Sequence, residues 1–160
     1  MKSESKENGR EKTPPMISLL PTTLIQSLVD NYHNNQLSFI NENLSVEDAH
    51  SIWFDLPTLK NFIEDIEEQA AIIDPNVTDA DLGIRFYYAA YPEFPEEPVP
   101  SDHALRHTLV MIPTKKEDGL NYDFNPCEEE GKSLAIRPVM ALAQNHGSLV
   151  PPDTSTVETY

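Results

Sequence analysis

The segment from Leu56 to about Ile73 carries the clearest amphipathic pattern in the chain, and it limits the possible folds most. Apolar side chains recur there at helical spacing, at Leu59, Phe62, Ile63, Ile66, Ala70 and Ile73. The opposite face is polar, which is typical of a helix with one side on a core and one in solvent. Asp55 suits the N-cap, Pro57 the first turn and Asp74-Pro75 the end of this helix. Such a helix needs an apolar layer to cover.

Three segments have the composition of strands and supply that layer. Residues 50–55 contain Ile, Trp and Phe in succession, residues 83–91 alternate around an aromatic centre, and residues 106–112 end before Pro113. The second and third segments are expected to pair antiparallel across a proline-rich acidic loop, 92–102, because consecutive strands are usually neighbours.

The remaining segments have weaker patterns. Residues 21–34 predict a helix, and whether it continues through 37–40 after a break at Asn34-Asn35 stays open. Residues 114–132 read as a loop, with Glu117-Asp118-Gly119 as a turn. Residues 133–145 are ambiguous; a short helix from Pro138 to Asn145 is favoured, with Gly147 as its stop.

Together these elements predict an α+β fold, with a small, mainly antiparallel sheet of about three strands packed against helices and long acidic, proline-rich loops. Residues 1–15 are expected to be a disordered polar tail, residues 16–150 a single domain, and residues 151–160 a polar C-terminal tail.

The formal net charge is −16, and residues 1–15 carry a net charge of +1, so the excess of negative charge lies outside this segment. Such a field repels duplex nucleic acid and anionic membrane surfaces, and it is compatible with a basic partner protein. The first fifteen residues have no apolar run like that of a secretory signal, so a cytoplasmic location is expected. The one cysteine, Cys127, precedes Glu128–Glu130 and is interpreted as a structural or surface residue.

Asp48 and His50 lie just before the first predicted strand, where an acid–base pair could be displayed. Histidine is the natural general base near neutral pH, and His107 at the start of another strand is its possible companion. The chain has no G-x-S-x-G nucleophile motif. The alternative is that these residues have no catalytic role and are only the polar residues at the starts of their strands.

A second candidate site is the aromatic strand. Arg85, Tyr87, Tyr88 and Tyr91 combine tyrosine with arginine, a composition typical of binding hot spots, and Trp53 is a further candidate. Ordinary packing of a sheet with one face on a helix explains the same alternation.

Metal binding has weaker support. Asp102, His103 and His107 include an H-x3-H spacing, but the two histidines are predicted on a loop and a strand rather than on one helix face. The acidic loops lack the D-x-D-x-D-G spacing of a calcium loop. No cofactor is predicted.

Three runs resemble a set of small uncharacterised proteins common in Bacteroidota. These are DAHSIWF from Asp48, GIRFYYAAYP from Gly83, and TLVMIPT from Thr108. The resemblance spans roughly residues 20–115 and implies the same order of elements, with no assigned activity.

The favoured hypothesis is therefore a non-catalytic interaction or accessory protein of the bacterial cytoplasm that binds a basic partner. Its expected surface lies near Tyr88, Tyr91 and His107. The alternative is a small hydrolase or ligand-binding enzyme that uses Asp48, His50 and His107. Convergence of these three side chains in a concave pocket would favour the enzyme. The oligomeric state is left open.

Overall fold

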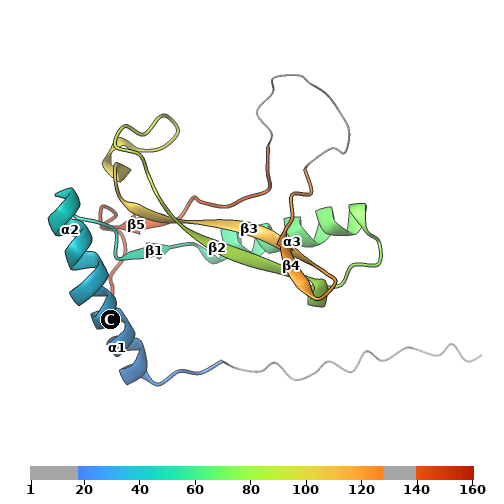
Figure 1. Ribbon diagram of the computed structural model, residues 1–160, viewed down its shortest axis with the longest axis horizontal. Coiled ribbons are helices and arrows are strands. Elements are labelled where there is room, and N and C mark those ends of the chain that lie inside the picture. Colours follow the sequence, from blue (N-terminus) through green and yellow to red (C-terminus); the bar gives the residue numbers. More distant parts are fainter. Residues whose placement is uncertain (1–17, 128–139) are drawn as a thin grey trace, which may run out of the picture.

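The computed structural model of the 160-residue chain describes residues 18–127 and 140–160. The fold is α+β (Figure 1). The helical elements are α1 (Thr22–Tyr32), the π-helical turn η1 (His33–Leu37), α2 (Ser38–Leu44), α3 (Leu56–Ile73) and the short 3₁₀ turns η2 (Asp79–Asp81) and η3 (Ser101–His103). The strands are β1 (Ser51–Trp53), β2 (Leu82–Ala90), β3 (His107–Glu117), β4 (Leu120–Asp123) and β5 (Ser148–Val150).

The predicted helix over 56–73 is confirmed with its N-cap. The Asp55 carboxylate accepts hydrogen bonds from the Thr58 N–H at 2.8 Å and the Thr58 hydroxyl at 2.6 Å. Phe62, Ile66 and Ala70 are buried along one side of α3. Phe62 and Ile66 form a cluster with Met111 of β3, so α3 covers one face of the sheet as expected.

The Asp55 cap predicts an acid-sensitive contribution to stability. Hydrogen bonds from the Thr58 side chain and N–H hold the pKa of Asp55 below its ordinary value of 3.8. A depressed folded-state pKa contributes stability that is present above the unfolded value and is lost as the pH falls through the folded value. The urea midpoint should therefore fall less between about pH 7 and about pH 3 in Asp55→Asn than in the wild type. Asp65→Asn, on the solvent side of α3, is the matched control and should retain the wild-type pH dependence.

The antiparallel pairing of β2 and β3 is confirmed, with Tyr88 opposite Leu109 and Ile84 opposite Pro113. The prediction that the second strand stops at Pro113 is wrong, because β3 continues to Glu117. The carbonyl of Pro113 accepts from the Phe124 N–H at 2.9 Å. The proline nitrogen faces this same side, away from β2, so its missing N–H removes no bond from the β2–β3 ladder.

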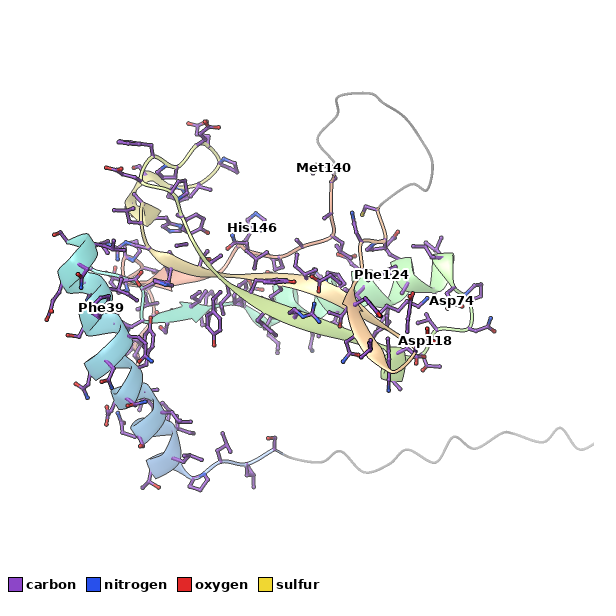
Figure 2. The ribbon with its side chains drawn as sticks, viewed as in Figure 1. Phe39, Asp74, Asp118, Phe124, Met140 and His146 are labelled. Carbon is purple, nitrogen blue, oxygen red and sulfur yellow. The ribbon has the colours of Figure 1, made fainter. Side chains whose placement is uncertain are left out.

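The prediction of a loop over 114–132 is wrong at its start, since β3 and β4 form a hairpin there. Asp118, labelled in Figure 2, and Gly119 connect the two strands. Their φ angles are 49° and 80°. Positive φ at both central residues is the geometry that Asp-Gly favours in a tight hairpin, which agrees with the turn predicted at this position.

The first predicted strand does not join the main sheet, which consists of β2, β3 and β4. Instead β1 pairs antiparallel with β5, with Ile52 opposite Leu149.

The favoured helix over 138–145 is wrong for residues 140–145, and its first two residues lie outside the described residues. Gln144 exchanges both backbone hydrogen bonds with Met111, at 2.9 and 3.1 Å, so this segment extends along β3.

Gly147 does not stop a helix but lets two segments approach closely. A Cβ at this position would overlap the Ile52 side chain and lie 2.6 Å from the Phe54 ring. We expect Gly147→Ala to lower the free energy of unfolding by about 2 kcal/mol, because overpacking forces side chains from their preferred rotamers. Gly119→Ala is the comparison: it meets no atom within 4 Å but has a positive φ, so its smaller loss would be due to the backbone alone. Urea denaturation measures both, and a larger loss in Gly119→Ala would contradict the steric explanation.

The helix over 21–34 continues without a break, which settles the open alternative. α1, η1 and α2 follow one another directly, with helical backbone at both junctions. In Figure 1 this long helix stands beside the sheets. Phe39 projects from the outer side of α2 (Figure 2) and is 67% exposed. Within residues 18–127 and 140–160, none of the helices combines the length and apolarity needed to span a bilayer.

Candidate functional site

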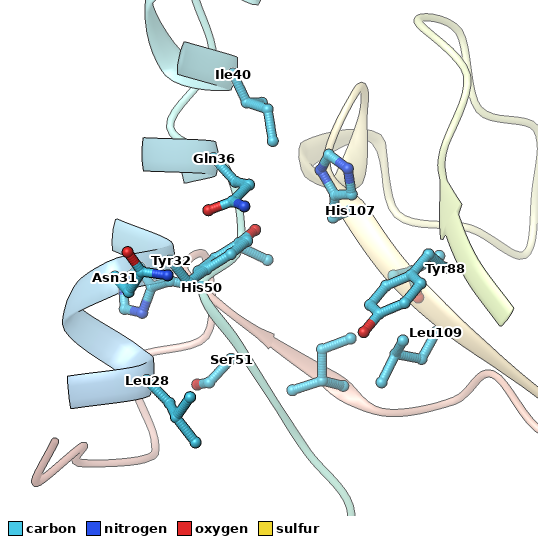
Figure 3. A pocket seen from close by; sticks show the side chains of 13 residues that line it. Leu28, Asn31, Tyr32, Gln36, Ile40, His50, Ser51, Tyr88, His107 and Leu109 are labelled. Atoms are coloured by element: carbon cyan, nitrogen blue, oxygen red, sulfur yellow. The ribbon is translucent and has the colours of Figure 1, made fainter. Parts of the chain in front are cut away.

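A pocket of about 580 Å³ lies between the long helix and the ends of β1, β2 and β3. The helix contributes Leu28, Asn31, Tyr32, Gln36 and Ile40, and the strands with their flanks contribute Ala49, His50, Ser51, Ile52, Tyr88, His107, Thr108 and Leu109. Figure 3 shows Tyr32 and Gln36 on one side and His107, Tyr88 and Leu109 on the other. This volume is in the range of small-molecule sites. The π-helical turn that carries Gln36 is a rare feature that occurs frequently at functional sites.

Asp48 is a fully buried carboxylate at the edge of this pocket. Its Oδ1 accepts from the Ala49 N–H at 2.8 Å and the His107 N–H at 2.6 Å. Its Oδ2 pairs with Nδ1 of His107. Its own N–H donates to the side-chain oxygen of Asn41 at 2.9 Å. A buried charge is tolerated only with such partners. These hydrogen bonds therefore stabilise the ionised form of Asp48.

The Asp48 pair determines which nitrogen of His107 is available. A carboxylate only accepts hydrogen bonds, so Nδ1 of His107 carries the proton. In the neutral ring Nε2 is then an acceptor, and no hydrogen bond to it is found within residues 18–127 and 140–160. The His107 side chain is 37% exposed and lines the pocket. An imidazole held in this way by a carboxylate is the arrangement of a general base.

His50 has a similar arrangement elsewhere in the pocket wall. Its Nδ1 lies 3.0 Å from Oε1 and 2.9 Å from Oε2 of Glu158. Its ring also meets the His33 ring edge-on, with centroids 5.3 Å apart. Glu158 belongs to the segment that the sequence predicts as a polar tail, and this contact places it beside the pocket.

Tyr32 lies between the two histidines in Figure 3. Burial raises the pKa of the Tyr32 hydroxyl, and the negative charge of Asp48 and the neighbouring Tyr88 act in the same direction. The hydroxyl therefore stays protonated over the physiological range and can donate a hydrogen bond to a ligand.

Arg106 connects the chain segments that carry Asp48 and His107, which together are called the dyad below. Its Nε donates to the Asp102 carbonyl at 2.8 Å, and its Nη1 donates to the Glu47 carbonyl and, at 3.4 Å, to that of Pro151. Glu47 and Arg106 directly precede Asp48 and His107 in sequence. The guanidinium thus joins both halves of the dyad to the C-terminal segment.

The predicted enzyme residues are therefore brought together: Asp48 and His107 are in contact, and His50 lines the same pocket. The residues of the predicted aromatic surface lie in different surroundings and do not form one surface. Arg85 and Tyr87 both bond the Asp123 carboxylate, and Tyr88 lines the pocket. The Tyr91 ring lies against the His103 ring in a tilted arrangement, and Trp53 is 51% exposed on β1.

The weak metal candidates do not converge. His107 pairs with Asp48, whereas Asp102 and His103 line a separate pocket of about 320 Å³ with Asp153. In the described part of the chain, no group of three or more His, Cys, Asp or Glu side chains is arranged to hold a metal ion.

Sequence reasoning missed the pocket residues on the helix and in the C-terminal segment. Asn31, Tyr32 and Gln36 line the pocket, but the helical pattern of their segment does not distinguish them as site residues. Glu158 lies 108 positions from His50, so no local spacing connects the two. The positions of Asp48 and His50 immediately before a strand were the only signal of this site.

The sequence matches no protein-family model, and the searches of curated proteins and solved structures also gave no match. The resemblance to the Bacteroidota proteins therefore stays a prediction. The candidate site rests on its geometry alone.

Proposed function

We propose that this protein binds a small organic molecule in the pocket beside Asp48 and His107, and that His107 acts on it as an acceptor and general base. The observation that carries this proposal is the fully buried Asp48 paired with a histidine that lines a pocket. It favours the small hydrolase or ligand-binding enzyme that uses Asp48, His50 and His107 over the non-catalytic alternative.

The chemistry follows from the dyad. Nε2 of His107 takes a proton from a ligand hydroxyl, amine or bound water, and ionised Asp48 stabilises the imidazolium that forms. General-base assistance of this kind contributes about 10²–10⁴-fold to a rate. In a hydrolase the nucleophile would be an activated water.

A fragment screen by ligand-observed NMR tests the proposal. Bound fragments should shift the amides of Ala49, Ser51 and Leu109, and His107→Gln should weaken their binding by about tenfold, since an amide that bonds Asp48 cannot also place an acceptor at the position of the imidazole Nε2. His146→Gln, an exposed histidine outside the pocket lining, is the matched control and should leave binding unchanged. Failure of every fragment to shift these amides would refute the proposal.

A second candidate function is binding of a basic protein. Tyr88 and Phe94 are 90% and 81% exposed, and the chain has a net charge of −16. Such a surface favours a basic protein over duplex nucleic acid or an anionic membrane, and a cytoplasmic location fits this proposal. Phe94→Ser should abolish a salt-sensitive complex with an identified partner, while Phe39→Ser, at an exposed phenylalanine of α2, should not.

A further inference from the structure

Among residues 18–127 and 140–160, the pocket wall supplies hydrogen-bond acceptors but no lysine or arginine side chain to hold an anion. Arg106, next to His107 in sequence, is directed to the backbone carbonyls of Glu47, Asp102 and Pro151. A carboxylate or phosphate in this pocket would therefore have no permanent positive charge to pair with.

The two imidazoles add negative potential instead of cancelling it. His107 rests on Asp48 and His50 on Glu158, each through Nδ1, so each neutral ring directs an Nε2 acceptor away from its carboxylate. An ammonium group has three N–H donors and no acceptor, which complements these nitrogens. The carboxylates behind the rings attract the same positive charge, with reduced solvent screening at the buried Asp48.

The rest of the wall suits an organic cation better than a hydrated metal ion. The rings of Tyr32 and Tyr88 line the pocket, and aromatic faces attract cations. Leu28, Ile40 and Leu109 supply apolar surface for a hydrocarbon body. The net charge of −16 also raises the local concentration of cations and lowers that of anions.

We propose that the pocket selects small organic amines, bound as ammonium ions, over carboxylates and phosphates of the same size. This inference rests on the proposed small-molecule function and specifies the class of its ligand. The ammonium group meets Nε2 of His107, and the hydrocarbon part lies against the tyrosines and aliphatic side chains. The amine is then also placed to give up a proton to the dyad.

The test uses three probes with one body: tyramine, the alcohol tyrosol, and 3-(4-hydroxyphenyl)propanoate. The full chain is titrated with each at about pH 7.5, where an ordinary histidine is mostly neutral, and amide shifts are recorded. Tyramine should shift the amides of Ala49, Ser51 and Leu109 and bind at least about tenfold more tightly than the carboxylate, with tyrosol between them.

Gln36→Lys introduces a positive charge into the pocket lining and keeps the fold, because Gln36 is exposed on the helix. It should lower the affinity for tyramine and raise that for the carboxylate, each by about tenfold. The double variant Glu96→Gln/Glu97→Gln reduces the net negative charge by two outside the pocket. Its tyramine affinity should stay within about twofold of the wild type.

The outcomes separate the two proposals. If the carboxylate binds in the pocket as tightly as tyramine, the amine inference is overturned and the small-molecule function stands. If no probe shifts the pocket amides, or tyramine shifts only the acidic loops, the inference is overturned as well. In that case failure of the fragment screen at the same amides would remove the small-molecule function too.

Discussion

Replacing Asp48 with alanine should lower the free energy of unfolding by about 3 kcal/mol, because hydrogen bonds to a charged group contribute about 1.5–3 kcal/mol each. Asp48 is fully buried and accepts from the N–H groups of Ala49 and His107. Alanine would leave both donors buried without an acceptor, and it would release the ring of His107. Ligand binding and any general-base activity should be lost together with stability.

Asp48→Asn separates these effects. Its side-chain oxygen can still accept from the two N–H groups, but its amide has no negative charge to stabilise an imidazolium. We expect a smaller loss of stability than in Asp48→Ala and a similar loss of function. Glu47→Gln, an exposed neighbour, is the control and should change neither. Urea denaturation at neutral pH measures the stability, and wild-type stability in Asp48→Ala would contradict the role of this buried carboxylate.

Phe62→Ala should destabilise the protein by about 3–5 kcal/mol, the usual range for deleting a buried phenyl ring. Phe62 is 4% exposed and packs with Ile66 and Met111, where α3 meets the sheet. The loss combines the transfer of apolar surface with the cavity that remains.

Ile63→Ala tests whether this cost comes from burial or from the helix itself. Ile63 is adjacent on α3 and 44% exposed, so its replacement should cost about 1 kcal/mol or less. Equal losses for the two variants, measured by urea denaturation, would show that the Phe62 side chain does not form the core described above.

The elements that could be predicted are those whose signals are local. The apolar stripe of α3, its Asp55 cap and the alternation of β2 are each complete within one segment. The predictions that were wrong concern which backbone segments pair with one another. Pro113 was expected to end a strand, yet its nitrogen faces away from the β2 ladder, and this direction depends on register. Residues 140–145 had helical composition, but Gln144 bonds the backbone of Met111.

The candidate site was predicted only as a set of residue types. Asp48, His50 and His107 have the residue types and the positions near strand starts of a candidate site. The structure places His50 and His107 in the lining of one pocket, with Asp48 buried against His107. The helix wall of that pocket, with Tyr32 and Gln36, was not predicted because nothing in residues 22–44 indicates which face meets β2 and β3.

The sequence alone determined the α+β class, the position of α3 and the antiparallel β2–β3 pair, since side-chain periodicity and caps act within a few residues. Only the tertiary structure decided that β1 joins β5, that Asp48 is buried against His107, and that Glu158 reaches His50. Asp48 and His107 are 59 positions apart in the sequence, and His50 and Glu158 are 108 positions apart. Their existence depends on how whole elements pack, which no local pattern encodes.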